Sequence, residues 1–179
     1  MRSKRIKIEE GCGVYHCIAR VVGGERLLGD EEKEHLRKLM WSLADFCGVE
    51  IITYCLMSNH THFLVRVPEV GAISDKELHQ RMVTYYGKKE TWVVGEAEYF
   101  EQSGHISTHV RKMLVARMGD VSQFMRELKQ RFSKYYNKKH KRFGTFWAER
   151  FKSVLVEDST DALQTVAMYI DLNPVRAGM

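Results

Sequence analysis

A pair of histidines, His60 and His62, most constrains what this chain can fold into. They lie within the run 54–67, which is rich in β-branched and aromatic residues and is followed by Pro68. That composition predicts a β-strand. Because side chains alternate between the two faces of a strand, both imidazoles are expected side by side on one face. The opposite, core-facing set is Thr61, Phe63, Val65 and Val67. Two adjacent imidazoles can share a metal ion; a solvated strand face without a ligand is the alternative.

Composition places the chain among ordinary soluble proteins and excludes several classes. It has 179 residues, of which 44% are hydrophobic and 28% charged, so we predict a single domain over 1–179. The net charge of +5 suggests a polyanionic partner. No apolar run is long enough to span a membrane, and no apolar segment follows the basic residues 1–5. The four cysteines form no C-x-x-C pair, which favours reduced thiols and a cytoplasmic location.

The first half of the chain predicts a β-α-β-β order. Residues 13–22 read as a strand closed by Gly23 and Gly24, and Asp30 is expected to cap a helix over 31–46 that stops at Gly48. A second strand over 49–57 then forms a hairpin with the histidine strand through Ser58 and Asn59.

The second half is predicted to be mainly helical. One helix opens at Ser74 and Asp75 and runs to about residue 86; helical periodicity returns at Ser107 and is interrupted at 119–120. Residues 87–104 show no clear pattern, and we expect a loop or an insertion around 87–106. A fourth strand over 151–156 precedes a final helix that is capped by Asp158 or Ser159 and ended by Pro174. Its predicted buried stripe is Leu163, Val166 and Ile170.

A strongly basic stretch follows Ser122, where Glu127 and Glu149 are the only acidic residues up to Ser153. Cations supply salt-sensitive attraction to phosphates, and the interleaved aromatic residues can stack on unpaired bases. The alternative is a solvated charged helix face above an aromatic core stripe. We favour nucleic-acid binding, and the predicted contacts are Lys129, Arg131, Lys134, Lys138, Lys139, Lys141, Arg142, Trp147, Arg150 and Lys152.

On the final helix, Tyr169 and Asn173 are four residues apart and therefore lie on the same side. Taken alone, this pair is explained as well by an aromatic residue at the edge of the core and a helix-end asparagine that bonds to the backbone.

Read together with the histidine pair, the sequence resembles the HUH endonuclease superfamily, specifically the single-tyrosine, REP-associated type of transposase. Four stretches carry the resemblance, in the order of that family: 15–21 (YHCIARV), 56–65 (LMSNHTHFLV), 143–153 (FGTFWAERFKS) and 169–178 (YIDLNPVRAG). Thr61 stands where the family usually has a bulky apolar residue, and Ser58 replaces a frequent proline.

The resemblance implies a ferredoxin-like or RRM-like α+β sandwich: an antiparallel sheet of four or five strands, with helices on one face and a metal site on the other. It implies that Tyr169 is the nucleophile and that His60, His62 and Asn173 bind Mg²⁺ or Mn²⁺. The implied activity is cleavage and rejoining of single-stranded DNA at hairpin-flanked sites through a 5′-phosphotyrosine. Tyr136 is the second choice of nucleophile, because His140 follows it by four residues.

Two alternative functions and the oligomeric state remain to be considered. A non-catalytic module of the same fold that binds single-stranded DNA or RNA is the main alternative function. A phosphoesterase with two H-x-T/S motifs is disfavoured, because only His105 and Ser107 fit that pattern. Relatives include monomers and dimers, so a homodimer is left undecided.

Overall fold

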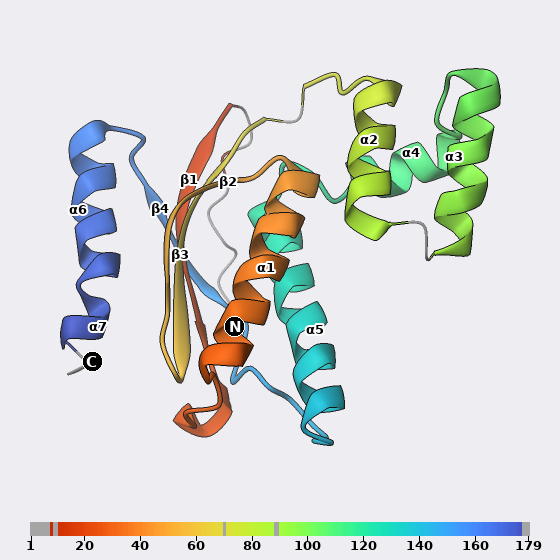
Figure 1. The fold of residues 1–179 in the computed structure, drawn as a ribbon. Helices are drawn as coiled ribbons and strands as arrows, with labels where there is room; N and C mark the ends of the chain where they lie inside the picture. The colour runs from red at the N-terminus through yellow and green to blue at the C-terminus, as the bar shows by residue number, and fades with distance from the viewer. Residues whose placement is uncertain (1–7, 9–10, 70, 88–89, 177–179) are drawn as a thin grey trace, which may run out of the picture.

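A four-stranded antiparallel sheet runs through the centre of the computed structural model, which describes residues 8, 11–69, 71–87 and 90–176 (Figure 1). Its strands are β1 (Gly13–Arg20), β2 (Glu50–Leu56), β3 (His60–Val67) and β4 (Lys152–Val156), in the order β2-β3-β1-β4. A β-α-β-β-α-β chain in this order is the ferredoxin-like arrangement. The predicted fold class is therefore confirmed.

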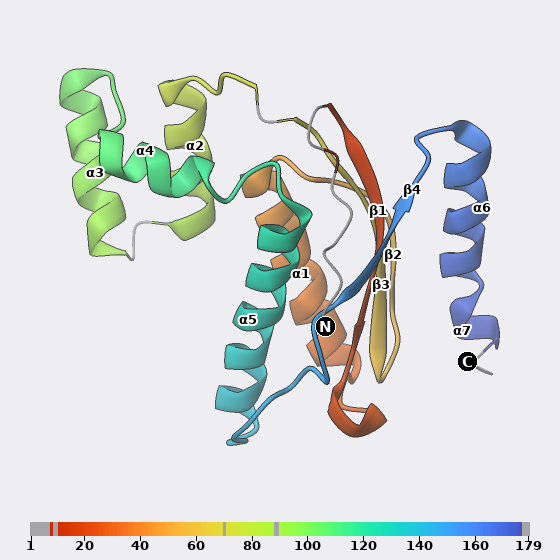
Figure 2. The same ribbon diagram turned by 180° about the vertical axis from the view of Figure 1, so that it is seen from behind.

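Two long helices, α1 (Asp30–Cys47) and α5 (Val121–Lys139), cover one face of the sheet (Figures 1 and 2). The core-facing side chains of β3 point toward this layer, and Phe63 and Val65 are fully buried with residues of both helices. Thr61, between the two histidines, is also fully buried. This confirms the predicted division of β3 into a core face and an imidazole face.

The opposite face is covered in part by α6 (Thr160–Asp171), which is followed by the short helix α7 (Asn173–Arg176) (Figure 1). The sequence predicted helices on one face only, so this is a difference from the expected arrangement. Its cause is a second, smaller core, in which Ile170 is buried against Val14, Cys55 and Leu64. Leu163 and Val166 pack beside it and are partly buried.

The ends of the elements follow local chemistry, with some corrections to the sequence prediction. Gly29, rather than Asp30, is the N-cap of α1, and Asp30 lies in the first turn, where a carboxylate suits the helix dipole. Gly48 ends α1 in the left-handed region, as predicted. β1 ends at Arg20, because residues 22–24 form a short 3₁₀ turn, η1 (Val22–Gly24). Pro174 lies inside α7, just after its first residue, where proline is tolerated.

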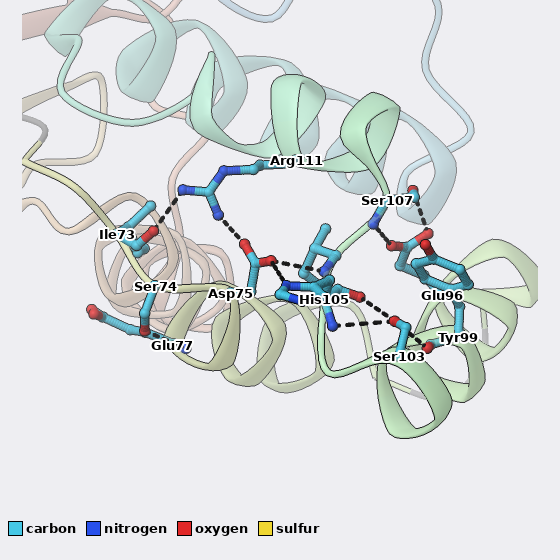
Figure 3. A network of polar contacts seen from close by, with 11 residues as sticks. Ile73, Ser74, Asp75, Glu77, Glu96, Tyr99, Ser103, His105, Ser107 and Arg111 are labelled. Atoms are coloured by element: carbon cyan, nitrogen blue, oxygen red, sulfur yellow. Dashed lines mark hydrogen bonds and ion pairs between the residues drawn. The ribbon is translucent and has the colours of Figure 1, made fainter.

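Three shorter helices form a helical extension beside α1 and α5: α2 (Asp75–Tyr86), α3 (Thr91–Ser103) and α4 (Thr108–Val115) (Figure 1). The sequence left the region of α3 without an element; it is a helix in which only Val93 and Glu96 are buried, which explains its weak periodicity. Polar contacts hold the extension together (Figure 3). Asp75 forms an ion pair with Arg111, and buried Glu96 accepts hydrogen bonds from the backbone nitrogen and hydroxyl of Ser107.

Several sequence predictions concern single features. Cys12, Cys17, Cys47 and Cys55 are all free thiols. Within the described ranges, no helix is both long and apolar enough to cross a bilayer. The basic residues 1–5 and the last residues of the C-terminal motif, 177–178, lie outside the described part of the chain.

Candidate active site

The two histidines of β3 lie side by side on the face of the sheet that α1 and α5 leave uncovered. The centroids of the His60 and His62 rings are 5.1 Å apart. The register of β1 and β3 places Arg20 opposite His60 and Ile18 opposite His62, so all four side chains share this face. The adjacency predicted from the strand periodicity is observed.

A third histidine, His16 on β1, belongs to this cluster and was not assigned a role from the sequence. Its Nε2 lies 2.9 Å from Nδ1 of His62, and the two rings are stacked with their centroids 5.2 Å apart. His16 is only 8% exposed. Strand alternation alone places the His16 side chain on the other face of β1 from the core-facing residues Tyr15 and Cys17. Its neighbour on the adjacent strand depends on the register of the sheet, which periodicity does not specify.

Tyr169 on α6 is brought to the same cluster. The centroid of its ring lies 6.0 Å from that of His16 and 6.0 Å from that of His62, in edge-on geometry. Its neighbour Ile170 is fully buried and anchors this turn of α6 on the sheet, while Tyr169 itself is 44% exposed. The phenol is therefore held beside the imidazoles and remains accessible to solvent.

Two polar contacts fix α6 over the sheet. The hydroxyl of Thr53 on β2 donates to Asp171 at the end of α6, at 3.0 Å. Arg66 on β3 forms ion pairs with Glu50 and with Asp158, which lies just before α6. Because its carboxylate is held by Arg66, Asp158 does not cap α6; Ser159 occupies the N-cap position without a side-chain hydrogen bond.

Asn173, the predicted third metal ligand, lies one helical turn beyond Tyr169. Its amide nitrogen donates to the backbone oxygen of Tyr169 at 2.9 Å. This contact is the local helix-end bond considered as the alternative from the sequence. It uses an amide hydrogen and does not involve the side-chain oxygen, which is the atom that a cation would bind.

The surroundings keep the imidazoles uncharged. Burial lowers the pKa of His62 to about 4, with smaller contributions from His16, His60 and Arg20. Burial also lowers the pKa of His16, and burial together with Arg20 lowers that of His60. At neutral pH the rings therefore offer lone pairs rather than positive charge, as metal binding requires. No cluster of three or more His, Cys, Asp or Glu side chains suited to a metal ion occurs in the described ranges. A metal site here would combine two imidazoles with an amide oxygen.

The basic stretch lies mostly away from the imidazoles. α5 covers the opposite face of the sheet, and its aromatic residues Phe132 and Tyr136 belong to the main core (Figures 1 and 2). Arg131 bonds to Glu127, and Lys139 forms ion pairs with Glu31 and Glu32. The core-stripe interpretation therefore accounts for these aromatic residues. Nucleic-acid contact by the cations stays a prediction.

Part of the basic stretch does reach the imidazole face. Lys152 on β4 is paired with Ile18 of β1 and is exposed. Its Nζ lies 3.5 Å from a carboxylate oxygen of Glu149.

Phe143, in the loop between α5 and β4, is 94% exposed and is the most exposed large aromatic side chain of the basic stretch. Trp147 is buried, and its indole nitrogen donates to the backbone oxygen of Lys129. The other predicted contacts that lie at the surface are Lys134, Lys138, Lys141 and Arg150.

Tyr136, the second choice of nucleophile, is poorly placed for attack. It is 6% exposed and packs between Phe146 and His140, with ring centroids 4.6 and 4.2 Å away. Burial raises the pKa of its hydroxyl, which opposes formation of the phenolate. The geometry therefore favours Tyr169.

Residues 12–93 match the sequence model of the family described as transposase, IS200-like. The likeness to that family covers rather less than half of the chain. The matched segment carries His16, His60 and His62, whereas Tyr169 and Asn173 lie beyond it.

Solved structures extend the likeness beyond the matched segment. A structure described as the REP-associated tyrosine transposase bound to a REP hairpin aligns with a TM-score of 0.61 and 16% identity, covering 99% of this chain and 75% of that one. A crystal structure described provisionally as a transposase from Deinococcus radiodurans R1 aligns with a TM-score of 0.41 and 16% identity, covering 96% of each chain. A search of curated proteins finds no match. The first alignment supports the same fold over nearly the whole chain.

Proposed function

We propose that this chain cleaves and rejoins single-stranded DNA at hairpin-flanked sites, with Tyr169 as the nucleophile. The observation that carries the proposal is the position of the Tyr169 ring, 6.0 Å from the rings of both His16 and His62 on an open part of the sheet. The Tyr169 side chain is 44% exposed, which leaves the phenol accessible to a phosphate group.

The proposed reaction is a transesterification. The hydroxyl oxygen of Tyr169 attacks a backbone phosphorus, and the bond to the 3′ oxygen breaks. The tyrosine loses its proton, the departing 3′ oxygen gains one, and the 5′ phosphate remains joined to the tyrosine. Attack by a different 3′-hydroxyl reverses these steps and joins two strands, so the energy of the phosphodiester bond is kept and no nucleotide cofactor is needed.

The residues present fit a divalent cation. His60 and His62 are uncharged at neutral pH, and the side-chain oxygen of Asn173 is available one turn after Tyr169. We propose that these three residues hold Mg²⁺ or Mn²⁺, a loose, uncharged donor set suited to a cation that arrives with the phosphate. When bound, the cation would act as a Lewis acid on a non-bridging phosphate oxygen. The chain itself orients the phenol, through the buried anchor Ile170 and the contact between Thr53 and Asp171.

The substrate class follows from the shape of the site and from the relatives. One relative of the same fold is described as bound to a REP hairpin. A phosphate must reach a phenol that lies between α6 and the sheet, and an unpaired strand meets this requirement more easily than a rigid duplex. The imidazoles and Tyr169 come from one chain, so the proposed site is complete in a monomer.

Covalent trapping tests the proposal. The purified chain is incubated with a DNA hairpin that carries single-stranded flanks, in Mn²⁺, and a protein–DNA adduct is sought on a denaturing gel. We expect the adduct with the wild-type chain and none with Tyr169→Phe. Tyr136→Phe is the matched control and should retain the adduct. His60→Ala should lower its yield on the order of 10²-fold or more, because a bound cation contributes several kcal/mol to such reactions.

Binding measured in parallel separates this proposal from a non-catalytic module. Tyr169→Phe should bind the same hairpin as tightly as the wild-type chain, since the phenol acts in the reaction rather than in affinity. If the wild-type chain binds the hairpin but forms no adduct under any divalent cation, the binding-module alternative stands instead. An adduct that persists in Tyr169→Phe would assign the nucleophile to another residue.

A further inference from the structure

His60 is the first residue of β3, and its ring is held by the preceding residue of the chain. The side-chain oxygen of Asn59 lies 2.7 Å from Nδ1 of His60. The side-chain nitrogen of Asn59 lies 3.4 Å from the backbone oxygen of Gly24, which belongs to η1. A series of polar contacts therefore runs from the turn after β1, through Asn59, to an imidazole of the candidate site.

The direction of each contact follows from the chemistry of the groups. A backbone carbonyl only accepts hydrogen bonds, so the atom of Asn59 that faces Gly24 is the amide nitrogen. The amide oxygen then faces His60, and this oxygen also only accepts. Nδ1 of His60 must therefore carry the hydrogen. In an uncharged imidazole, Nε2 then keeps the lone pair that a cation needs.

The backbone on which Asn59 lies is held by two other segments. The backbone oxygen of Asn59 accepts from the nitrogen of Val21, and that of Ser58 accepts from the nitrogen of Leu28, both at 2.9 Å. Gly24 has a φ of +70°, a backbone conformation that L side chains rarely adopt. The glycine thus permits the turn in which its carbonyl meets the amide of Asn59. These contacts all lie within the chain, so the amide is positioned without a ligand.

The second imidazole of β3 is held in the same way. Nδ1 of His62 lies 2.9 Å from Nε2 of His16. Within the part of the chain that the structure describes, Nδ1 of His60 and of His62 each has a hydrogen-bond partner, and neither Nε2 has one. Both rings are therefore held through the same nitrogen, which leaves Nε2 of each for a shared ligand.

We propose that Asn59 is a positioning residue that fixes His60 in the tautomer whose Nε2 is free for a divalent cation. This role rests on the proposed function, in which His60 is a metal ligand. Asn59 touches neither the cation nor DNA in this scheme and acts through the His60 ring. Loss of such an outer partner of a metal-bound histidine usually weakens metal binding by about 10- to 100-fold.

The first measurement determines the tautomer of His60 in the metal-free chain. Proton–nitrogen NMR spectra of the ring at pH 7.5 distinguish a hydrogen on Nδ1 from one on Nε2, and His60→Ala identifies the signals. We expect the wild-type ring to carry its hydrogen on Nδ1. In Asn59→Leu, which removes the acceptor at similar volume, the hydrogen should move to Nε2, the position that an unconstrained imidazole favours in water. A ring that keeps its hydrogen on Nδ1 in this variant would overturn the proposal.

The second measurement is isothermal titration with Mn²⁺, without DNA. Asn59→Leu should bind Mn²⁺ about 10- to 100-fold more weakly than the wild-type chain. Asn59→Asp should keep most of the affinity, because its carboxylate accepts from Nδ1 of His60 although it cannot donate to Gly24. Equal weakening in the two variants would also overturn the proposal, since it would assign the effect to the lost contact with the turn.

Asn137→Leu is the matched control. Asn137 also donates to the carbonyl of a glycine with positive φ, Gly144, at 2.9 Å, but it lies on α5, across the sheet from the imidazoles. This variant should keep the Nδ1 tautomer of His60 and the wild-type affinity for Mn²⁺, and circular dichroism checks that every variant is folded.

Failure of the proposed function would give a different result. A wild-type chain that binds no Mn²⁺ would contradict the proposed metal site, whereas the tautomer measured without metal decides the role of Asn59 by itself. Neither measurement involves DNA or Tyr169, so both results are independent of whether the chain cleaves DNA.

Discussion

His16 has the contacts of a residue that orients a ligand. Its Nε2 lies 2.9 Å from Nδ1 of His62, and only one of these two nitrogens can carry the shared hydrogen. If Nδ1 of His62 donates, its Nε2 keeps a lone pair for a cation; with the opposite arrangement Nε2 is protonated and cannot bind one. Under the proposed function, His16 acts as a positioning residue that selects the metal-binding tautomer of His62.

We therefore expect His16→Ala to weaken Mn²⁺ binding by about 10- to 100-fold, the usual cost of losing a partner of a metal-bound histidine. Isothermal titration of the chain with Mn²⁺ measures this directly, without DNA. His16→Gln is the matched control, because its side-chain oxygen can accept the same hydrogen bond, and it should recover much of the affinity. A role in packing alone would predict that the alanine and glutamine variants bind Mn²⁺ as the wild-type chain does.

At the scale of residues, the sequence predicted that His60 and His62 lie together but did not predict that His16 joins them. The first two share a strand, so a period of two residues places them together. His16 joins them only through the pairing of β1 with β3, in which it lies opposite Leu64 and diagonal to His62. Register of this kind is a tertiary property. The approach of Tyr169 likewise depends on how α6 packs, and only the resemblance to a family indicated it.

At the scale of elements, Glu127 links the helical extension to the body of the protein. From α5 it accepts hydrogen bonds from Tyr85 of α2 and from Arg117, which follows α4, as well as from Arg131 of its own helix. Burial raises the pKa of the Glu127 carboxyl, but Arg117, Tyr85 and Arg131 together outweigh burial and hold the pKa below its usual value. The carboxylate is therefore the form that the fold stabilises.

We expect Glu127→Gln to lower the free energy of unfolding by about 1–3 kcal/mol at pH 7, since it removes a charged acceptor from donors that stay partly buried. A carboxyl with a lowered folded-state pKa stabilises above its unfolded pKa and loses that contribution as the pH falls through the folded-state value. The difference between wild type and variant should therefore shrink in acid. Urea titrations at pH 7, 5 and 3 measure it, with Glu77→Gln as the exposed control. A difference that is constant with pH would show that the charge of Glu127 is not what stabilises the contact.

The helical extension also shows where sequence patterns are weak predictors of elements. α2 was predicted with its correct cap, because Ser74 accepts from the backbone nitrogen of Glu77 and begins a periodic apolar stripe. α3 was missed, because only Val93 and Glu96 of this helix are buried, and Glu96 is a carboxylate that accepts from Ser107. Hydrophobic periodicity reports burial. A helix with one buried apolar residue and one buried carboxylate gives little periodic signal.

At the scale of the whole molecule, the sheet separates two unequal cores. The larger lies under α1 and α5 and includes the fully buried residues Leu36, Phe63 and Phe132. The smaller lies under α6 and is built around Ile170 and Leu64. The apolar pattern of each helix was readable from the sequence. The side of the sheet on which α6 lies was not, because an apolar stripe fits either face equally well.

This division predicts that stability and activity respond to different substitutions. Phe132→Ala removes a fully buried ring from the main core and should cost about 3–5 kcal/mol. For a chain of this size that corresponds to a fall in Tm of roughly 6–20 °C. Adduct formation per folded molecule should be unchanged, because the imidazole face does not contain this ring. Ile170→Ala should instead loosen α6 and lower adduct formation at temperatures where the rest of the chain stays folded.

Hydrogen exchange of the native chain separates the two effects. In Ile170→Ala, amides of α6 should exchange faster than in the wild type, whereas amides of α1 and α5 keep their protection, because the smaller core can open locally. In Phe132→Ala all protected amides should exchange faster together. The same exchange in α1, α5 and α6 for both variants would mean that the two cores open as one unit. In that event the position of Tyr169 would depend on the stability of the whole protein, rather than on the local packing of Ile170 against the sheet.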